Sequence, residues 1–141
     1  MLAFLLAGVS FALLWATSFH PEYGYFIDEL YYIACSKHLA FGYVDHAPLV
    51  PWIARIATTL FGESVYGLRL FAAGAGALSV LLVGLLARRL GGGRTAQVLA
   101  CLAATTSIVF LAMFNFFTVN CTGILLWTLS SWMLLELCRS R

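Results

Sequence analysis

The stretch TAQVLACLAATTSIVFLAMFNFFTVNCTGILLWTLSSWMLL, residues 95–135, contains no Asp, Glu, Lys or Arg. As one helix it would be about 60 Å long, roughly twice the thickness of the hydrocarbon core of a bilayer. The stretch must therefore reverse. We expect the reversal between Phe114 and Asn120, where polar side chains interrupt the apolar run. The charge-free stretch thus predicts two membrane-spanning helices joined by a short hairpin.

The composition supports a membrane location for the whole chain. Hydrophobic residues make up 62% of the sequence and charged residues only 10%, against roughly 25% charged in soluble domains. Two further apolar runs, Met1–Pro21 and Leu70–Ala87, are long enough to cross a bilayer. We predict an all-α membrane protein with one membrane domain over residues 1–141. Its four spans are expected at about 1–19, 66–87, 95–113 and 120–138.

The basic residues predict the orientation, because short loops rich in Lys and Arg stay on the cytoplasmic side. Arginines crowd the connection between the second and third spans and follow the fourth span: Arg88, Arg89, Arg94, Arg139 and Arg141. The sequence thus predicts cytoplasmic termini in the cell (inner) membrane, with the loop 20–65 on the outer face. A formal charge of +2, held mostly in these anchors, gives no indication of nucleic-acid binding.

The outer loop is expected to hold two short helices that lie along the membrane. Acids favour a helix start, and Asp28 and Glu29 precede residues at helical spacing: Leu30, Ile33, Ala34, Lys37 and Phe41. Gly42 is expected to end this first helix. The second is expected to open at Pro48 and Pro51 and to close at Gly62. Its apolar stripe consists of Ile53, Ile56, Ala57 and Leu60.

The adjacent acids Asp28 and Glu29 are the leading candidates for chemistry. Acids beside a membrane span cost free energy unless they face water or a partner. One interpretation is a helix cap; the other is a general base with an acidic neighbour that orients the acceptor or raises the pKa of the base by repulsion. The two roles are compatible.

Aromatic residues are dense in the same loop: Tyr23, Tyr25, Phe26, Tyr31, Tyr32, Phe41, Tyr43 and Trp52. An interfacial belt explains most of them. The alternative is that one or two rings pack against the C–H face of a sugar, and we include Tyr32 as the candidate substrate contact. No His, Cys and Asp cluster has the spacing of metal ligands, so we expect neither a metal nor a cofactor.

Several motifs, in their order and spacing, resemble the amino-terminal part of bacterial family 39 glycosyltransferases. They are GYFIDELYY (24–32), GYVDHAPL (42–49), LFGES (60–64), GLRL (67–70) and RLGGGR (89–94). This family is related to protein O-mannosyltransferases and aminoarabinose transferases, which are membrane enzymes of the GT-C fold. The chain departs from the family pattern at Ala47, which replaces a proline, and in the hairpin around Asn120, which lacks an acid.

The resemblance implies that a sugar passes, with inversion, from a polyprenyl-phosphate carrier to a lipid, glycan or protein acceptor on the outer face. It implies Asp28 as base with Glu29 beside it, and it places His46 and Arg69 near the active site. Arg69 is the candidate ligand of the carrier phosphate. Lys37 is a weaker candidate for the same task, and Asn120 is kept as a hairpin contact.

Length sets the chain apart from the family it resembles, whose members have more spans. The sequence therefore resembles a partial GT-C fold, either truncated and inactive alone or completed by a second chain. The alternative is a small non-catalytic membrane protein whose small residues, Ala72 with Gly76 and Ala73 with Ala77, pack against partner helices. A transporter ranks last, since no formally charged residue is predicted near mid-membrane.

Overall fold

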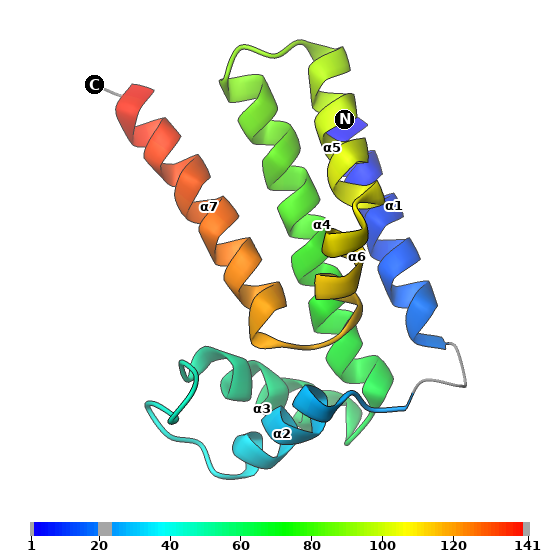
Figure 1. Cartoon of the computed structure of the whole chain (residues 1–141), viewed down its shortest axis with the longest axis vertical. Helices are drawn as coiled ribbons and strands as arrows, with labels where there is room; N and C mark the ends of the chain where they lie inside the picture. Colours follow the sequence, from blue (N-terminus) through cyan, green and yellow to red (C-terminus); the bar gives the residue numbers. More distant parts are fainter. Residues whose placement is uncertain (1, 20–23, 140–141) are drawn as a thin grey trace.

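The structure, a computed structural model, describes residues 2–19 and 24–139, which form helices and loops with no strand among them. Figure 1 shows the elements in order. They are α1 (Leu2–Ala16), η1 (Thr17–Phe19), α2 (Ile27–Lys37), α3 (Leu49–Phe61), α4 (Val65–Arg89), α5 (Arg94–Thr106), α6 (Ile108–Asn115) and α7 (Val119–Arg139). The predicted all-α fold is confirmed.

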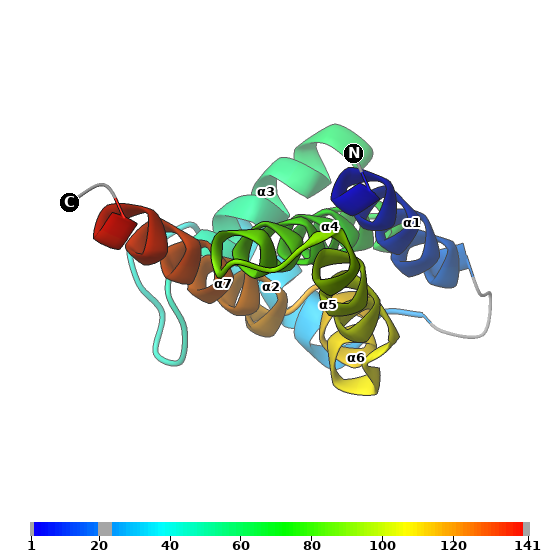
Figure 2. The same ribbon diagram turned by 90° about the horizontal axis from the view of Figure 1, so that it is seen from above.

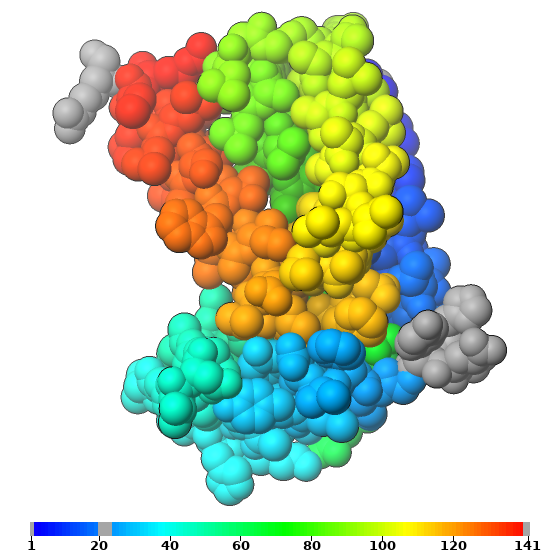
Figure 3. Space-filling view, viewed as in Figure 1, coloured from blue at the N-terminus to red at the C-terminus, as the bar shows by residue number. Residues whose placement is uncertain are grey.

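Helices α1, α4, α5 and α7 run along the long axis of the molecule, and α2 and α3 lie across one end (Figure 1). Helix α4 is central and packs against α1, α5 and α7, as the view from above also shows (Figure 2). Helices α2, α3 and their connecting loop form one continuous layer beneath the bundle (Figure 3). By length and composition α1 with η1, α4 and α7 can each cross a membrane, and α5 with α6 can form a fourth, broken span.

The break between α5 and α6 bends the expected third span by 61°. Ser107 has extended backbone angles (φ −65°, ψ 123°), and its side chain accepts a hydrogen bond from the backbone N–H of Phe110. The hydroxyls of Thr105 and Thr106 donate to the carbonyls of Cys101 and Leu102. Such bonds compete with the helix ladder and favour bends, so the Thr-Thr-Ser run replaces one straight span with two helices.

Helix α2 ends at Lys37, four residues before the end that helical spacing predicts. The Tyr43 hydroxyl lies 3.1 Å from the Cys35 carbonyl oxygen and 2.9 Å from that of His38, within hydrogen-bond distance of both. The same oxygen accepts the Ala40 N–H at 3.2 Å. The tyrosine thus satisfies backbone groups that would otherwise continue the helix. Helix α3 ends before Gly62, whose φ of +68° favours glycine.

The buried face of α2 is also shifted by one residue from the predicted stripe. Buried positions are Glu29, Tyr32, Ile33 and Ser36, whereas Leu30 and Ala34 are exposed. Of the predicted stripe, only Ile33 is buried. The exposed face of α2 therefore carries apolar side chains, as expected for a helix that rests in the membrane interface.

Small residues on α4 let its neighbours approach closely. A Cβ added at Gly76 would lie 2.6 Å from Leu14 Cδ1 on α1 and 3.1 Å from Phe114 Cγ on α6. Ala72 and Ala73 are fully buried in the same core. This small-residue face is therefore used within the chain, which removes the observation that favoured a non-catalytic protein packing against partner helices.

We predict that Gly76→Val lowers the free energy of unfolding by about 1–3 kcal/mol, because the new side chain must displace Leu14 and Phe114. Gly74→Val is the matched control, since a Cβ there meets no atom within 4 Å. Thermal unfolding of the purified chain in detergent measures both. Equal losses for the two variants would show that helix propensity, not packing against α1, sets the requirement for glycine.

Candidate functional site

The two candidate acids of α2 face different surroundings, and Glu29 is the buried one. Its side chain is 0% exposed and accepts hydrogen bonds on both oxygens from Arg69, at 2.9 Å from Nε and 3.0 Å from Nη2. Helix α2 presents Glu29 inward because this residue shares a face with Tyr32, Ile33 and Ser36. Arg69 reaches it from the first turns of α4 and is 1% exposed.

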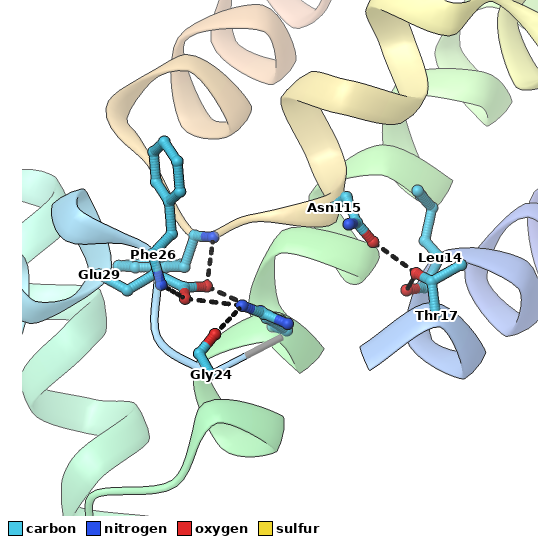
Figure 4. A network of polar contacts seen from close by, with 8 residues as sticks. Leu14, Thr17, Gly24, Phe26, Glu29 and Asn115 are labelled. Atoms are coloured by element: carbon cyan, nitrogen blue, oxygen red, sulfur yellow. Dashed lines mark hydrogen bonds and ion pairs between the residues drawn. The ribbon is translucent and has the colours of Figure 1, made fainter. Parts of the chain in front are cut away.

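Two backbone N–H groups complete the surroundings of Glu29. The N–H of Phe26 donates to Oε2 at 2.8 Å, which caps the start of α2, and the N–H of Phe117 donates to Oε1 at 3.0 Å. Figure 4 shows these bonds converging on the carboxylate. Glu29 therefore joins the start of α2, the start of α4 and the turn between α6 and α7.

Arg69 is fixed by further contacts. Its Nη2 also donates to the Gly24 carbonyl oxygen at 2.9 Å, and its guanidinium carbon lies 5.1 Å from the ring centroid of Phe116. Breaking a buried ion pair by removing one partner typically costs about 3–5 kcal/mol, because a buried charge remains uncompensated. In this arrangement Arg69 binds Glu29, and contact with a carrier phosphate would require it to leave that partner.

A second contact fastens the same end of the bundle. The Thr17 side chain contacts the side-chain amide of Asn115, linking η1 to the end of α6 (Figure 4). The Thr17 hydroxyl also donates to the Leu14 carbonyl oxygen at 2.6 Å. Together with the bonds of Glu29, this contact fixes the α6–α7 turn against the layer of α2 and α3.

Asp28 is half-buried, and its carboxylate forms no hydrogen bond or ion pair with residues 2–19 or 24–139. It occupies the second position of α2, where a negative charge is favoured by the helix dipole. The cap interpretation of the acid pair therefore applies to Glu29 and leaves Asp28 free. Of the two acids, Asp28 is the one that a substrate can reach.

An aromatic cluster encloses His46 next to this site. Its ring centroid lies 4.7 Å from that of Tyr43, 5.1 Å from that of Tyr32 and 5.5 Å from that of Tyr31. The imidazole is only 2% exposed, and Nδ1 lies 3.0 Å from the Ala47 carbonyl oxygen. Nε2 lies 3.8 Å from Asp45 Oδ1, which is too far for a hydrogen bond. His46 therefore packs the loop against α2.

Two tyrosines of the cluster, Tyr31 and Tyr32, have raised pKa values, to which nearby carboxylates contribute. Burial raises the pKa of Tyr32, the backbone N–H of Val119 lowers it, and the carboxylates of Asp28 and Asp45 raise it. The pKa of Tyr31 is raised chiefly because its hydroxyl donates to Asp45 Oδ1 at 2.8 Å. Both carboxylates thus lie close enough to Tyr32 to raise its pKa. The sequence places Asp45 in the motif GYVDHAPL, but no local pattern indicates that Asp45 binds Tyr31.

The two remaining candidates, Lys37 and Asn120, lie in different places. Lys37 lies nine residues after Asp28, about 13 Å along α2, and pairs with Glu63 at 2.6 Å on the surface. Asn120 is exposed in the first turn of α7, next to the Val119 N–H that influences Tyr32. The structure thus gathers Asp28, Glu29, Arg69, Tyr32 and His46 at one end of the bundle, brings Asn120 toward them, and leaves Lys37 apart.

A cavity of about 390 Å³ opens beside this group between α4, α7 and α3. Its walls are almost wholly apolar, and its lining includes Ile53, Phe71, Phe117 and Leu125. Phe117 belongs both to this cavity and, through its N–H, to the bonds of Glu29. The cavity can accept a hydrocarbon chain whose polar end would lie toward α2 and α3.

The fold and the site together define a class of protein: a multi-pass membrane helix bundle with a charged site at one membrane face. Comparison with protein-family models matches residues 45–141 to the family described as dolichyl-phosphate-mannose-protein mannosyltransferase, and the chain belongs to this family. The match confirms the resemblance to GT-C family 39 enzymes. It includes His46, Arg69 and Asn120, whereas Asp28 and Glu29 precede it. Neither curated proteins nor solved structures yielded a match.

Proposed function

We propose that this chain forms the acceptor-activating part of a glycosyltransferase that moves a sugar from a polyprenyl-phosphate carrier to an acceptor, with inversion, at the outer face of the cell membrane. The supporting observation is the division of the acid pair. Among the described residues, Glu29 is bound by Arg69 and two backbone N–H groups, whereas the half-buried carboxylate of Asp28 beside it has no hydrogen-bond or ion-pair partner. Family membership supports the reaction class.

In this proposal Asp28 accepts the proton of the acceptor hydroxyl or amine while that group attacks the anomeric carbon; the bond from this carbon to the phosphate oxygen breaks, and the carrier leaves as polyprenyl phosphate. A general base must lie within hydrogen-bond reach of the proton it removes, and a carboxylate without competing partners can do so. Glu29 and Arg69 are positioning residues, since they hold the start of α2 against α4 and Phe117. Tyr32 and His46 support the same segment, and Asn120 contacts substrate.

The lipid part of the donor is proposed to lie in the apolar cavity between α4 and α7. The lining offers carbon surface and little else, which suits a prenyl chain. Its end at Phe117 would bring the phosphate of the carrier toward the α6–α7 turn and Asn120. In this arrangement the carrier and its sugar approach Asp28 from the membrane side, and the acceptor approaches from the outer side.

The function is tested in a chimera in which residues 1–141 replace the matching segment of an active family member, which supplies the spans that we expect a complete groove to need. Polyprenyl-phosphate-linked mannose serves as donor, with a lipid, a glycan and a peptide as separate acceptors. We expect transfer to one acceptor class. A folded chimera that transfers to none of them, beside an active parent enzyme, would contradict the proposal.

Lys37→Ala should leave transfer within about threefold of the parent value. Its ion pair with Glu63 is exposed, and exposed pairs contribute roughly 0–1 kcal/mol. The same chimera and donor measure this variant. A hundredfold loss of transfer rate would indicate that Lys37 binds substrate after all. The carrier phosphate would then have to lie at the end of α2 that carries Lys37.

The proposed orientation places the α2–α3 layer outside and both termini in the cytoplasm, and cysteine labelling in intact cells tests it. Gly42 and Gly93 are suitable positions, because a Cβ at either meets no atom within 4 Å. In a cysteine-free background, an impermeant maleimide should label Gly42→Cys and spare Gly93→Cys. Labelling of the second variant with protection of the first would invert the topology.

A further inference from the structure

A separate cavity of about 460 Å³ lies at the other end of the bundle, away from α2 and α3. The start of α1, the end of α4, and the start of α5 with the turn before it enclose the cavity, and these segments meet at the top of Figure 1. Its lining combines the arginines Arg88 and Arg94 with the apolar side chains Leu2 and Phe4. No Asp or Glu contributes to this lining.

The two arginines of the cavity carry charge that no acid among the described residues compensates. Arg88 and Arg94 form no hydrogen bond or ion pair through their side chains with any residue that the structure describes. Their neighbour Arg89 differs, since it pairs with Glu136 of α7 at 2.7 Å. The cavity therefore presents two free guanidinium groups, which bind phosphate oxygens in a forked geometry.

The start of α5, which follows Gly93, also borders this cavity. Gly91 needs its φ of +93°, and a Cβ at Gly92 would lie 2.6 Å from the Ala87 carbonyl oxygen. Gly93 has an ordinary φ of −72° and open space around its Cα, so the backbone permits Ser or Asp there. Glycine at this N-cap instead leaves the first turn of α5 without a side-chain cap. These uncapped N–H groups belong to the turn that begins at Gly93 and Arg94, and both of these residues line the cavity.

Apolar surface adjoins the charged end. Leu2 is 49% exposed and Phe4 is 64% exposed on the face of α1 that borders the cavity. A free phosphate would leave this surface unused, whereas a phospholipid would cover it with an acyl chain. The position at the end of three spans also matches the depth of lipid headgroups.

We propose that this cavity binds the headgroup phosphodiester of an anionic phospholipid between Arg88, Arg94 and the start of α5, with an acyl chain along Leu2 and Phe4. In the orientation proposed above, on which this part of the inference rests, the cavity lies in the cytoplasmic leaflet. The site is independent of the chemistry at Asp28 and anchors the α4–α5 connection to the membrane surface.

Native mass spectrometry of the purified full chain in a neutral detergent tests the site, with phosphatidylglycerol and phosphatidylcholine of equal chain length as probes. We expect one phosphatidylglycerol to remain bound with an affinity about tenfold above that of phosphatidylcholine. The double variant Arg88→Gln/Arg94→Gln should remove this preference. The control variant Arg89→Gln removes one positive charge from the same segment and should keep this preference; the single variants Arg88→Gln and Arg94→Gln, which each remove one charge as well, should each weaken it.

Gly93→Asp gives a second, independent readout. Its carboxylate should cap α5 and raise the unfolding temperature while it lowers phosphatidylglycerol occupancy by repelling the phosphodiester. Equal binding of the two lipids, or equal loss in Arg89→Gln and the double variant, would overturn the proposal in favour of non-specific charge attraction. Displacement of the lipid by millimolar inorganic phosphate would overturn the assignment to a lipid.

Discussion

Asp28→Asn should lower the rate of sugar transfer by about 10²- to 10⁴-fold, the usual contribution of a general base. Asparagine keeps the size of the side chain and a hydrogen-bonding oxygen, but it cannot accept a proton. Asp28 forms no hydrogen bond or ion pair within residues 2–19 and 24–139, so the fold should not change. Single-turnover transfer in the chimera, with bound donor measured separately, gives the rate and the donor affinity.

The control for this result is Asp45→Asn, which alters the other carboxylate that raises the pKa of the buried Tyr32. Asp45 accepts a hydrogen bond from Tyr31 and is 60% exposed, and an amide oxygen can accept the same bond. We expect a change of at most about tenfold, since a neutral acceptor weakens but keeps the bond. If Asp28→Asn transfers within a few fold of the parent, Asp28 is not the base.

Arg69→Met should lower the free energy of unfolding by about 3–5 kcal/mol, because it leaves the carboxylate of Glu29 buried without its cation. The substitution also removes the bond to Gly24 and the contact with Phe116. The segment before α2 should loosen with it. Thermal unfolding in detergent measures the loss, and proteolysis of the loop between α1 and α2 reports the local change.

The double variant Glu29→Met/Arg69→Met separates charge from packing. Removing both charges should restore part of the lost stability, since the unpaired buried carboxylate is gone. Recovery should be incomplete, because the N–H groups of Phe26 and Phe117 lose their acceptor. A double variant no more stable than Arg69→Met would mean that an uncompensated charge on Glu29 is not the source of the instability.

The order of the candidate spans and of the two short helices between the first and second could be predicted from the sequence, because charge-free runs and clustered arginines are local signals; the division of the third span into α5 and α6 could not. The reversal near Asn115–Asn120 and the end of α3 at Gly62 follow from the same local chemistry. The bend at Ser107 was not predicted, since the hydroxyl bonds of Thr105 and Thr106 to the backbone are compatible with a straight helix until packing selects the bend.

The separate roles of Asp28 and Glu29 could not be predicted from the pair alone. They depend on the rotation of α2, and the apolar spacing of Leu30, Ile33 and Ala34 indicated a face shifted by one residue. Glu29 turns inward because Arg69, 40 positions later, supplies its partner. That contact crosses from α2 to α4 and has no signature in the local sequence.

Family membership limits the chemistry, but it does not assign these roles. The matched segment begins at Asp45, after the acid pair. The assignment of Asp28 as base and of Glu29 as a positioning residue therefore depends on burial and bonding: the carboxylate of Glu29 accepts four hydrogen bonds, and that of Asp28 accepts none from the residues described.

The most direct test compares Asp28→Asn with Glu29→Gln in one preparation of the chimera, by measuring both the unfolding temperature and the single-turnover transfer rate. We predict opposite patterns. Asp28→Asn should unfold close to the parent temperature, since it loses only the small favourable effect of its charge at the helix start, and should lose the rate. Glu29→Gln should unfold at a clearly lower temperature and, while folded, keep most of the rate. A stable Glu29→Gln variant without transfer activity, beside an active Asp28→Asn variant, would contradict the division of roles between the two acids.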